Sequence, residues 1–415
     1  MKKLFLCVFL LCLLLPLNLL AATEAEKQAA IDAGLAYLAS IQNSDGSFDG
    51  GTLDYLLSQT GSALLAFLEE KPNWGANAAA YQAVVDNGLN YIFNNANVVT
   101  IGPQAAGNPD GDGNGVGVKF YPGVYNTRDT YVTGIVLPAI ASSGTPDAVV
   151  GTGPLTGWTY KQVVQNAVDY FAFGQSDAAS GTYRGGWRYY ANFGNSDQST
   201  TQWPVIAGLF ASKMGVSYPQ FVKDELAFWT DYIQNPATGA AGYTSPTFSY
   251  GEMNETGALL LMQDFIGLPT GNPDVQAALN YINTNWQIGL GGYDGNIGHP
   301  YAMWAIYKGL ESTIGLDDTT AITNLRPDPG DVDNPDHPYN WWEDYCEYLV
   351  STQLGGGNWT GYSYWGSPLA TAWYINILAA TEIPDGQPVP EPATMLLVGS
   401  GLLGMGVFAR RKRKK

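Results

Sequence analysis

The sequence predicts an all-α protein in which six helical hairpins close into an α6/α6 toroid. Two observations carry this prediction: an aromatic-apolar pair recurs six times along the chain, and each pair lies on an apolar stripe with helical spacing. The pairs are Tyr37-Leu38, Tyr91-Ile92, Tyr170-Phe171, Tyr232-Ile233, Tyr281-Ile282 and Tyr348-Leu349. We expect a single domain over residues 25–380, because every hairpin repeats the same pattern.

The first helix of each hairpin is predicted to be amphipathic, and the second to be buried on most sides. Apolar residues stand seven and usually three positions before the second member of each pair, as Ile31 and Leu35 do before Leu38. The fourth repeat departs from this spacing with Thr230. The second helices are expected to begin near Thr60, Thr130, Thr200, Asn254, Pro300 and Pro368. They would form an inner ring within a ring of first helices.

The N-terminal residues have the pattern of a secretion signal. Lys2 and Lys3 precede an apolar run that begins at Leu4, and Ala21-Ala22 offers small residues for cleavage. We therefore expect residues 1–22 to be a signal peptide that is removed on export.

The C-terminal residues 389–415 resemble a PEP-CTERM sorting signal. Val389-Pro390-Glu391-Pro392 is followed by the uncharged apolar stretch 393–409 and by the basic cluster 410–415. That stretch is long enough for one transmembrane helix, and the basic cluster is expected to stay on the cytoplasmic side. The resemblance implies processing by an exosortase-type enzyme and delivery to the cell envelope, outer surface or extracellular matrix. Residues 381–388 would be a linker.

We call residues 23–388, which lie between the two predicted signals, the body of the protein. Its charge and cysteine content exclude several classes of partner and site. Removing residues 1–22 and 389–415 takes away eight of the 19 basic residues and one of the 37 acidic residues, which leaves a net charge of about −25. Such a body repels nucleic acid, which we exclude as a partner. Cys346 is the only cysteine outside the predicted signal, so an intrachain disulfide and a cysteine-based metal site are excluded as well.

Three segments also resemble a known repeat. Gln353, Gly357 and Trp359 follow the sixth pair at regular spacing, Gln42, Gly46 and Phe48 follow the first, and Gln175 and Gly185-Gly186-Trp187 follow the third with a longer loop. They resemble the QW repeats of terpenoid cyclases and protein prenyltransferase β subunits, and this resemblance implies an α/α toroid. The glutamine can tie the end of its helix to the next turn while the aromatic ring packs beneath it, which is a scaffold role.

The reactions of those families need motifs that this chain does not complete. Class II cyclases protonate an alkene with a DxDD-like motif, of which Asp197-Gln198-Ser199-Thr200 keeps only the first aspartate. Prenyltransferases hold zinc through Asp, Cys and His, but Asp344 and Cys346 are expected to pack outward. The Gly-Cys-Gly-Glu-Gln motif of the thioester subfamily is absent. The sequence therefore favours a ligand-binding toroid over an enzyme. A polysaccharide hydrolase or lyase, or a terpene cyclase-like enzyme, remains the alternative.

The N-termini of the inner helices are expected to meet at one rim of a central cavity. The candidate catalytic residues at this rim are Asp197, Glu252, Glu255, His299 and Tyr301, and the candidate ligand-binding residues are Arg128, Asp129, Gln202, Trp203 and Trp365. Two facing carboxylates would suit a glycoside hydrolase, and a Tyr or His base beside an Arg would suit a lyase. The acids equally suit helix caps, because helix N-termini carry free N–H groups.

One loop has the spacing of a calcium site. Asp110, Asp112 and Asn114 occupy positions 1, 3 and 5 of an EF-hand-type loop, with Gly115 at position 6. Position 12 is Tyr121, so the usual bidentate glutamate is missing. The loop is a candidate for weak calcium binding, with a flexible turn-rich loop as the alternative, and we expect no cofactor to be required. The expected partners are the processing enzyme and an envelope ligand such as a polysaccharide.

Overall fold

The computed structural model describes residues 22–48, 53–121, 128–327 and 339–386, and in these ranges twelve α-helices form six successive hairpins. The first helices of the hairpins are α1 (Glu24–Ile41), α3 (Ala78–Asn94), α5 (Tyr160–Gly174), α7 (Gln220–Ile233), α9 (Pro273–Asn285) and α11 (Trp341–Thr352). The second helices are α2 (Leu53–Glu69), α4 (Asp129–Ser142), α6 (Gln198–Ala211), α8 (Glu252–Phe265), α10 (Pro300–Ile314) and α12 (Ser367–Leu378).

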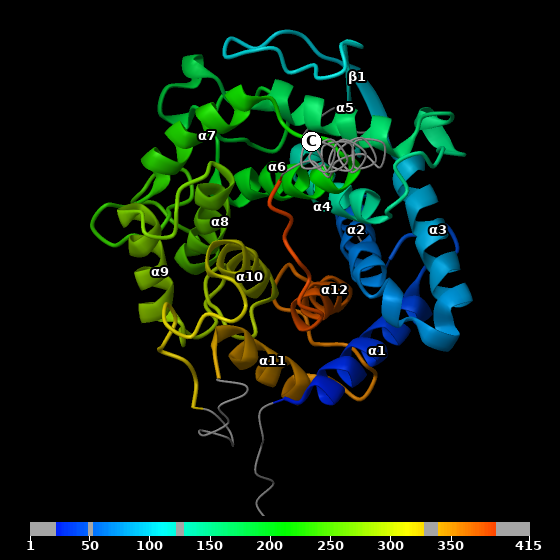
Figure 1. The fold of residues 1–415 in the computed structure, drawn as a ribbon, viewed down its shortest axis with the longest axis vertical. Coiled ribbons are helices and arrows are strands. Elements are labelled where there is room, and N and C mark those ends of the chain that lie inside the picture. Colours follow the sequence, from blue (N-terminus) through cyan, green and yellow to red (C-terminus); the bar gives the residue numbers. More distant parts are fainter. Residues whose placement is uncertain (1–21, 49–52, 122–127, 328–338, 387–415) are drawn as a thin grey trace, which may run out of the picture.

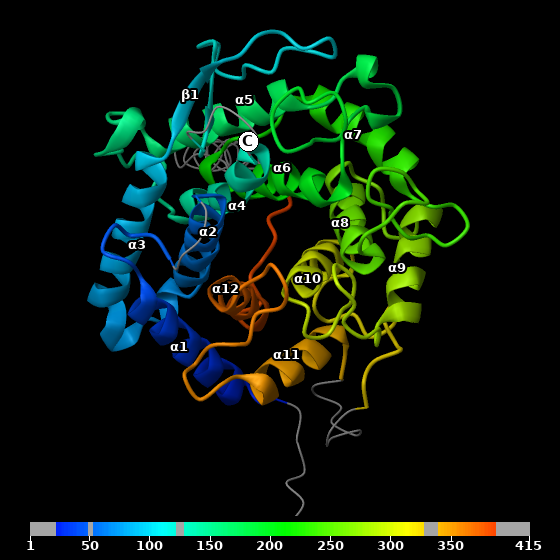
Figure 2. The same cartoon turned by 180° about the vertical axis from the view of Figure 1, so that it is seen from behind.

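The second helices form a closed inner ring. Each one packs against the next, from α2 through α4, α6, α8 and α10 to α12, and α12 returns to α2. The first helices surround this ring, as the two opposite views in Figure 1 and Figure 2 show. The circle closes where α1 packs against α11 and α12. The predicted α6/α6 toroid is therefore confirmed.

Two local features differ from the predicted pattern. The helix α2 begins at Leu53 rather than near Thr60, because the apolar run of this helix starts earlier and Thr60 Oγ1 donates to the Leu56 carbonyl within it. A short antiparallel pair, β1 (Asn97–Thr100) with β2 (Val116–Lys119), joins α3 to α4 and packs against α5. Valines favour this extended structure, which the helical repeat did not predict.

Glutamine side chains join neighbouring hairpins. Four outer helices end at such a residue, namely Gln42, Gln175, Gln234 and Gln353. Each side-chain amide donates to a glycine carbonyl in the following loop and to a carbonyl of the next outer helix. The predicted scaffold role of the QW-like residues therefore agrees with their contacts. Gln234 was not predicted to have this role. The glycine that accepts its hydrogen bond, Gly239, follows it by one residue more than the corresponding glycines follow Gln42 and Gln353.

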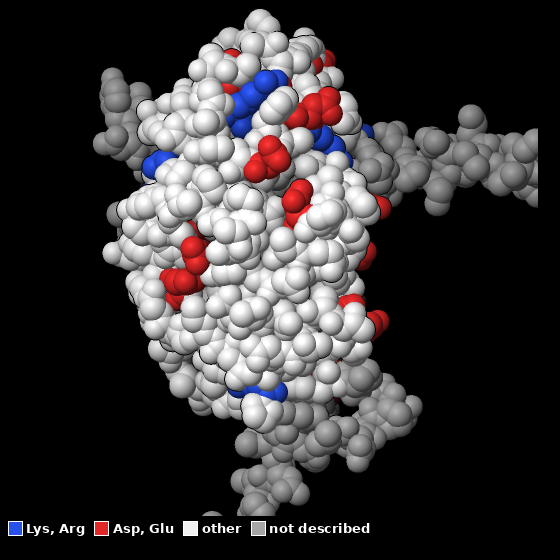
Figure 3. Space-filling view, turned by 90° about the vertical axis from the view of Figure 1, so that its left-hand side faces the viewer, with Lys and Arg blue, Asp and Glu red and all other residues white. Residues whose placement is uncertain are grey.

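The predicted segments at the two ends are mostly outside the described residues. These are residues 1–21 of the signal peptide and the whole of the apolar stretch 393–409. Within the ranges that the structure describes, no helix is both long and apolar enough to span a bilayer. On the side of the toroid that Figure 3 shows, acidic and basic side chains are scattered over a mostly uncharged surface.

Candidate functional site

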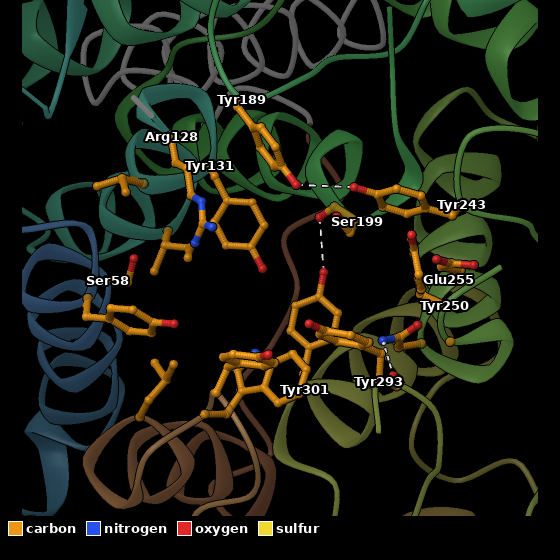
Figure 4. Close-up of a pocket in the computed structure, with 18 of the residues that line it drawn as sticks. Ser58, Arg128, Tyr131, Tyr189, Ser199, Tyr243, Tyr250, Glu255, Tyr293 and Tyr301 are labelled. Carbon is orange, nitrogen blue, oxygen red and sulfur yellow. Dashed lines mark hydrogen bonds between the residues drawn. The ribbon is translucent and has the colours of Figure 1, made fainter. Parts of the chain in front are cut away.

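A cavity of about 650 Å³ lies at the N-terminal ends of the inner helices. Half of its 20 lining residues are tyrosine or tryptophan, so its wall is amphipathic, with aromatic faces and hydroxyl groups side by side. The aromatic residues are Tyr55, Tyr131, Tyr189, Tyr243, Tyr250, Tyr293, Tyr301, Tyr364, Trp365 and Trp373. The other polar lining residues are Ser58, Arg128, Arg188, Ser199, Asn254 and Glu255. Figure 4 shows Arg128 and Tyr131 across the open centre from Glu255 and Tyr250.

A chain of hydrogen bonds sets the position of Tyr301 on this wall. The Tyr301 hydroxyl donates to the Ser199 carbonyl at 3.1 Å and accepts from Gln202 Nε2 at 2.6 Å. Behind them, the buried Lys308 donates from Nζ to Gln202 Oε1 at 3.0 Å and lies 4.3 Å from the ring centre of Trp203. Burial lowers the pKa of Lys308 well below its usual value. Gln202 and Trp203 therefore support the wall from behind and are not among the residues that line it.

Asp197 is fully buried behind the wall and caps α6. Its Oδ1 accepts from the Thr200 N–H at 2.6 Å, and its Oδ2 accepts from the Tyr243 hydroxyl at 3.3 Å. Arg188 Nε forms an ion pair with the same Oδ2 at 3.2 Å. Burial raises the pKa of Asp197, while Arg188 opposes this rise. The side chain therefore acts as a cap that also holds two cavity residues, Arg188 and Tyr243.

Glu255 is the one carboxylate among the described residues that line the cavity. It lies on the first turn of α8, is 3 % exposed, and accepts from Ser249 Oγ at 2.7 Å. Burial raises the pKa of Glu255 well above its usual value, although the Ser249 hydrogen bond opposes this effect. A carboxyl group of this kind is suited to hold a proton at neutral pH and to donate it.

Some of the remaining predicted residues line the cavity and others lie away from it. Arg128 and Trp365 line the cavity. Asp129 is buried in an ion pair with Lys119, and Glu252 accepts from the Tyr281 hydroxyl at 2.7 Å. His299 is fully buried, where its Nδ1 accepts from the Ala302 N–H at 3.3 Å and caps α10. The last three residues are not among those that line the cavity.

The cavity residues that sequence analysis missed come mainly from the loops between outer and inner helices. Tyr189, Tyr243, Tyr250, Tyr293 and Tyr364 all stand between the end of an outer helix and the start of the next inner helix. The predicted site contained residues at the N-termini of the inner helices and therefore did not include these loops. Tyrosines recur in the loops before successive inner helices, and this recurrence was the signal that could have identified them.

The nearest candidates for a prenyltransferase-type zinc triad, Asp344 and Cys346, make other contacts in the structure. Asp344 binds the Arg326 guanidinium, with Nε at 2.6 Å from Oδ1, and accepts from Trp286 Nε1 at 2.6 Å. Cys346 is fully buried on the outer helix α11, and burial raises the pKa of its thiol well above the usual value. Both side chains thus contribute to packing.

Comparison with solved structures identifies proteins of similar fold. A glycoside hydrolase family 76 mannosidase from Bacteroides thetaiotaomicron is 13 % identical, covers 85 % of this chain and 97 % of its own, and gives a TM-score of 0.51. An inactive α-1,6-mannanase variant of the same hydrolase family from Salegentibacter, in complex with α-1,6-mannotetrose, is 12 % identical, covers 85 % and 98 %, and gives 0.52. A type II terpene cyclase from Scytonema gives 0.48 at 12 % identity, covering 86 % and 98 %. At these identities the likeness extends to the fold alone.

Comparison with protein families identifies a sorting motif at the C-terminal end of the chain. Residues 388–414 match the PEP-CTERM protein-sorting motif, which indicates export. The resemblance noted in the sequence is thereby confirmed. No curated protein matches the chain.

Proposed function

We propose that this chain is an exported protein of the cell surface or extracellular matrix that binds a neutral sugar chain in its central cavity. The observation that carries the proposal is the wall of the cavity, which presents aromatic faces together with hydroxyl, amide and guanidinium groups. Sugars offer both apolar C–H faces and hydroxyl groups, so such a wall matches them on both counts. The α-1,6-mannotetrose bound by a mannanase of similar fold supports the same class of ligand.

The net charge of the body further limits the ligand. A surface with a net charge of about −25 repels anionic polymers at long range, which favours neutral sugars over uronic acids. Arg128 and Arg188 then serve as hydrogen-bond donors to sugar hydroxyls. The C-terminal sorting motif supports a location where such polymers occur, after an exosortase-type enzyme has processed the tail.

A binding assay with α-1,6-mannotetrose tests this proposal. We expect isothermal titration of the full chain to detect binding, and Tyr364→Ala to weaken it about tenfold or more, which corresponds to about 1.4 kcal/mol. Tyr364 lines the cavity, is 56 % exposed and stacks on Tyr293. Phe228→Ala is the matched control, because Phe228 is similarly exposed on the outer helix α7 and should leave the affinity unchanged. Equal weakening by both changes, or no binding of any neutral oligosaccharide, would contradict the proposal.

The second candidate is a glycoside hydrolase, favoured by the buried and cavity-facing Glu255. Glu255→Gln distinguishes the two functions because it keeps the shape of the side chain and removes its proton. If the cavity hydrolyses sugars, mass spectrometry should detect shorter products from the wild type and at least a hundredfold slower release from the variant. If the cavity only binds, the variant should retain affinity within a few-fold and neither protein should release products.

A further inference from the structure

The segment between β1 and β2 carries an acidic loop that takes no part in the cavity. Asp110 shapes this loop, since its Oδ1 accepts from the Gly113 N–H at 2.8 Å and its Oδ2 from the Gly115 N–H at 2.8 Å. Asp112 is exposed, and its Oδ2 accepts from Asn114 Nδ2 at 3.0 Å. Asn114 Oδ1 accepts from the Val116 N–H at 2.9 Å.

A third carboxylate comes to this loop from a different part of the chain. Asp169 lies on the outer helix α5, where its Oδ1 accepts from the Gly111 N–H at 3.0 Å and from Gln165 Nε2 at 2.9 Å. Its side chain is 0 % exposed, yet its Oδ2 has no hydrogen-bond partner among the described residues. A buried carboxylate oxygen without a donor is unfavourable unless a ligand satisfies it.

The three carboxylates lie close enough to bind one cation. Each of Asp110, Asp112 and Asp169 offers an oxygen within 4.8 Å of those of the other two. Oxygens that bind one calcium ion at 2.3–2.6 Å are at most about 5 Å apart, so the cluster has the right span. No lysine or arginine of the described residues forms an ion pair with any of the three.

We propose that Asp110, Asp112 and Asp169 bind a calcium ion, with Asp169 supplying the carboxylate that Tyr121 cannot supply at the last position of the loop. Three carboxylates without nitrogen or sulfur ligands suit a hard cation. The ion would join the loop after β1 to the outer helix α5 by neutralising their mutual repulsion. The sorting motif indicates export from the cytoplasm. Calcium sites of extracellular modules typically have low affinity.

Calcium titration of the full chain after chelator treatment tests this assignment. We expect one site with a Kd of about 10⁻⁴–10⁻³ M, the range of extracellular calcium modules, and a higher Tm in calcium than in chelator. Asp169→Asn should weaken binding at least tenfold, because it removes the charge and keeps an oxygen that accepts from the Gly111 N–H. Asp231→Asn is the matched control, since Asp231 is exposed on α7, away from the cluster, and should bind as the wild type does.

A second variant keeps the test decisive if Asp169→Asn does not fold. Asp112→Asn changes an exposed side chain and should also weaken calcium binding at least tenfold. Wild-type affinity in every variant that folds, or no calcium-dependent heat from the wild type at about 10 mM calcium, would overturn the proposal. Equal affinity for magnesium would overturn the assignment to calcium.

Discussion

At the scale of single residues, the helix caps of the inner ring determine how the rim of the cavity is built. Asp197 and His299 both cap inner helices, and both are fully buried. Their positions before the helices were predictable, because aspartate is a preferred N-cap residue and Pro300, directly after His299, is favoured in the first turn of a helix. Their burial was not, because it depends on Tyr243, Tyr362 and Trp365, which lie far away in the sequence and cover them.

The burial of His299 predicts an acid-sensitive contribution to stability. Burial lowers the pKa of His299 to about 4, so the folded state binds this proton less readily than the unfolded state, whose histidine has a pKa of about 6.5. The contribution is therefore fully present above pH 6.5 and is lost as the pH falls towards 4. When the pH is lowered from 7 to 5, protonation of His299 in the unfolded state should reduce the free energy of unfolding by about 2 kcal/mol.

His299→Asn measures this cost directly. Asparagine keeps an acceptor for the Ala302 N–H but cannot be protonated in this range. Urea unfolding of both proteins at pH 7 and pH 5 should therefore show the smaller loss of stability in the variant. The comparison is needed because the raised pKa of Glu311, about 7 owing to burial, acts in the opposite direction in both proteins. Equal losses would show that His299 does not contribute in this way.

At the scale of elements, the loops after the outer helices are fixed by glycine as much as by glutamine. Gly357 has a φ of +87°, and a Cβ placed on it would lie 2.3 Å from the Ala33 carbonyl oxygen of α1. The left-handed backbone and this close approach both require glycine. The spacing of Gln353, Gly357 and Trp359 was visible in the sequence, and their structural role could therefore be predicted.

Gly357→Ala should destabilise the protein by about 3 kcal/mol, because the new methyl group meets backbone atoms that cannot move independently of α1. Gly355→Ala is the matched control in the same loop, since no atom lies within 4 Å of the added Cβ. That change should stay within about 0.5 kcal/mol of the wild type. Thermal or chemical denaturation measures both, and similar effects would contradict the role assigned to Gly357.

At the scale of the whole molecule, the toroid is closed by contacts between its two ends. Gln353 Nε2 donates to the Ala30 carbonyl at 2.7 Å, and Lys27 Nζ forms an ion pair with Glu343 at 2.7 Å. In an open array the terminal repeats have one neighbour each, and they separate first. Closure gives every hairpin two neighbours, which favours unfolding in a single transition.

Gln353→Ala should lower the stability of the entire ring by about 1–3 kcal/mol, because it removes the side-chain amide that donates to the Ala30 and Gly357 carbonyls. Fluorescence and circular dichroism should still report one common transition. The control Gln82→Ala removes a glutamine that donates to Asp86 on its own helix, and should change stability by less than about 0.5 kcal/mol. A separate early transition in the variant would show that the ring does not unfold as a unit.

The sequence alone determined the repeat, the order of the helices and the sorting motif, because each of these depends on residues that are close together along the chain. The acidic loop was also visible, through the spacing of Asp110 and Asp112. Only the tertiary structure decided which side chains line the cavity and which lie behind them. It also brought Asp169 to the acidic loop. These features depend on how the hairpins pack around the ring, and packing joins residues whose separation in sequence carries no local signal.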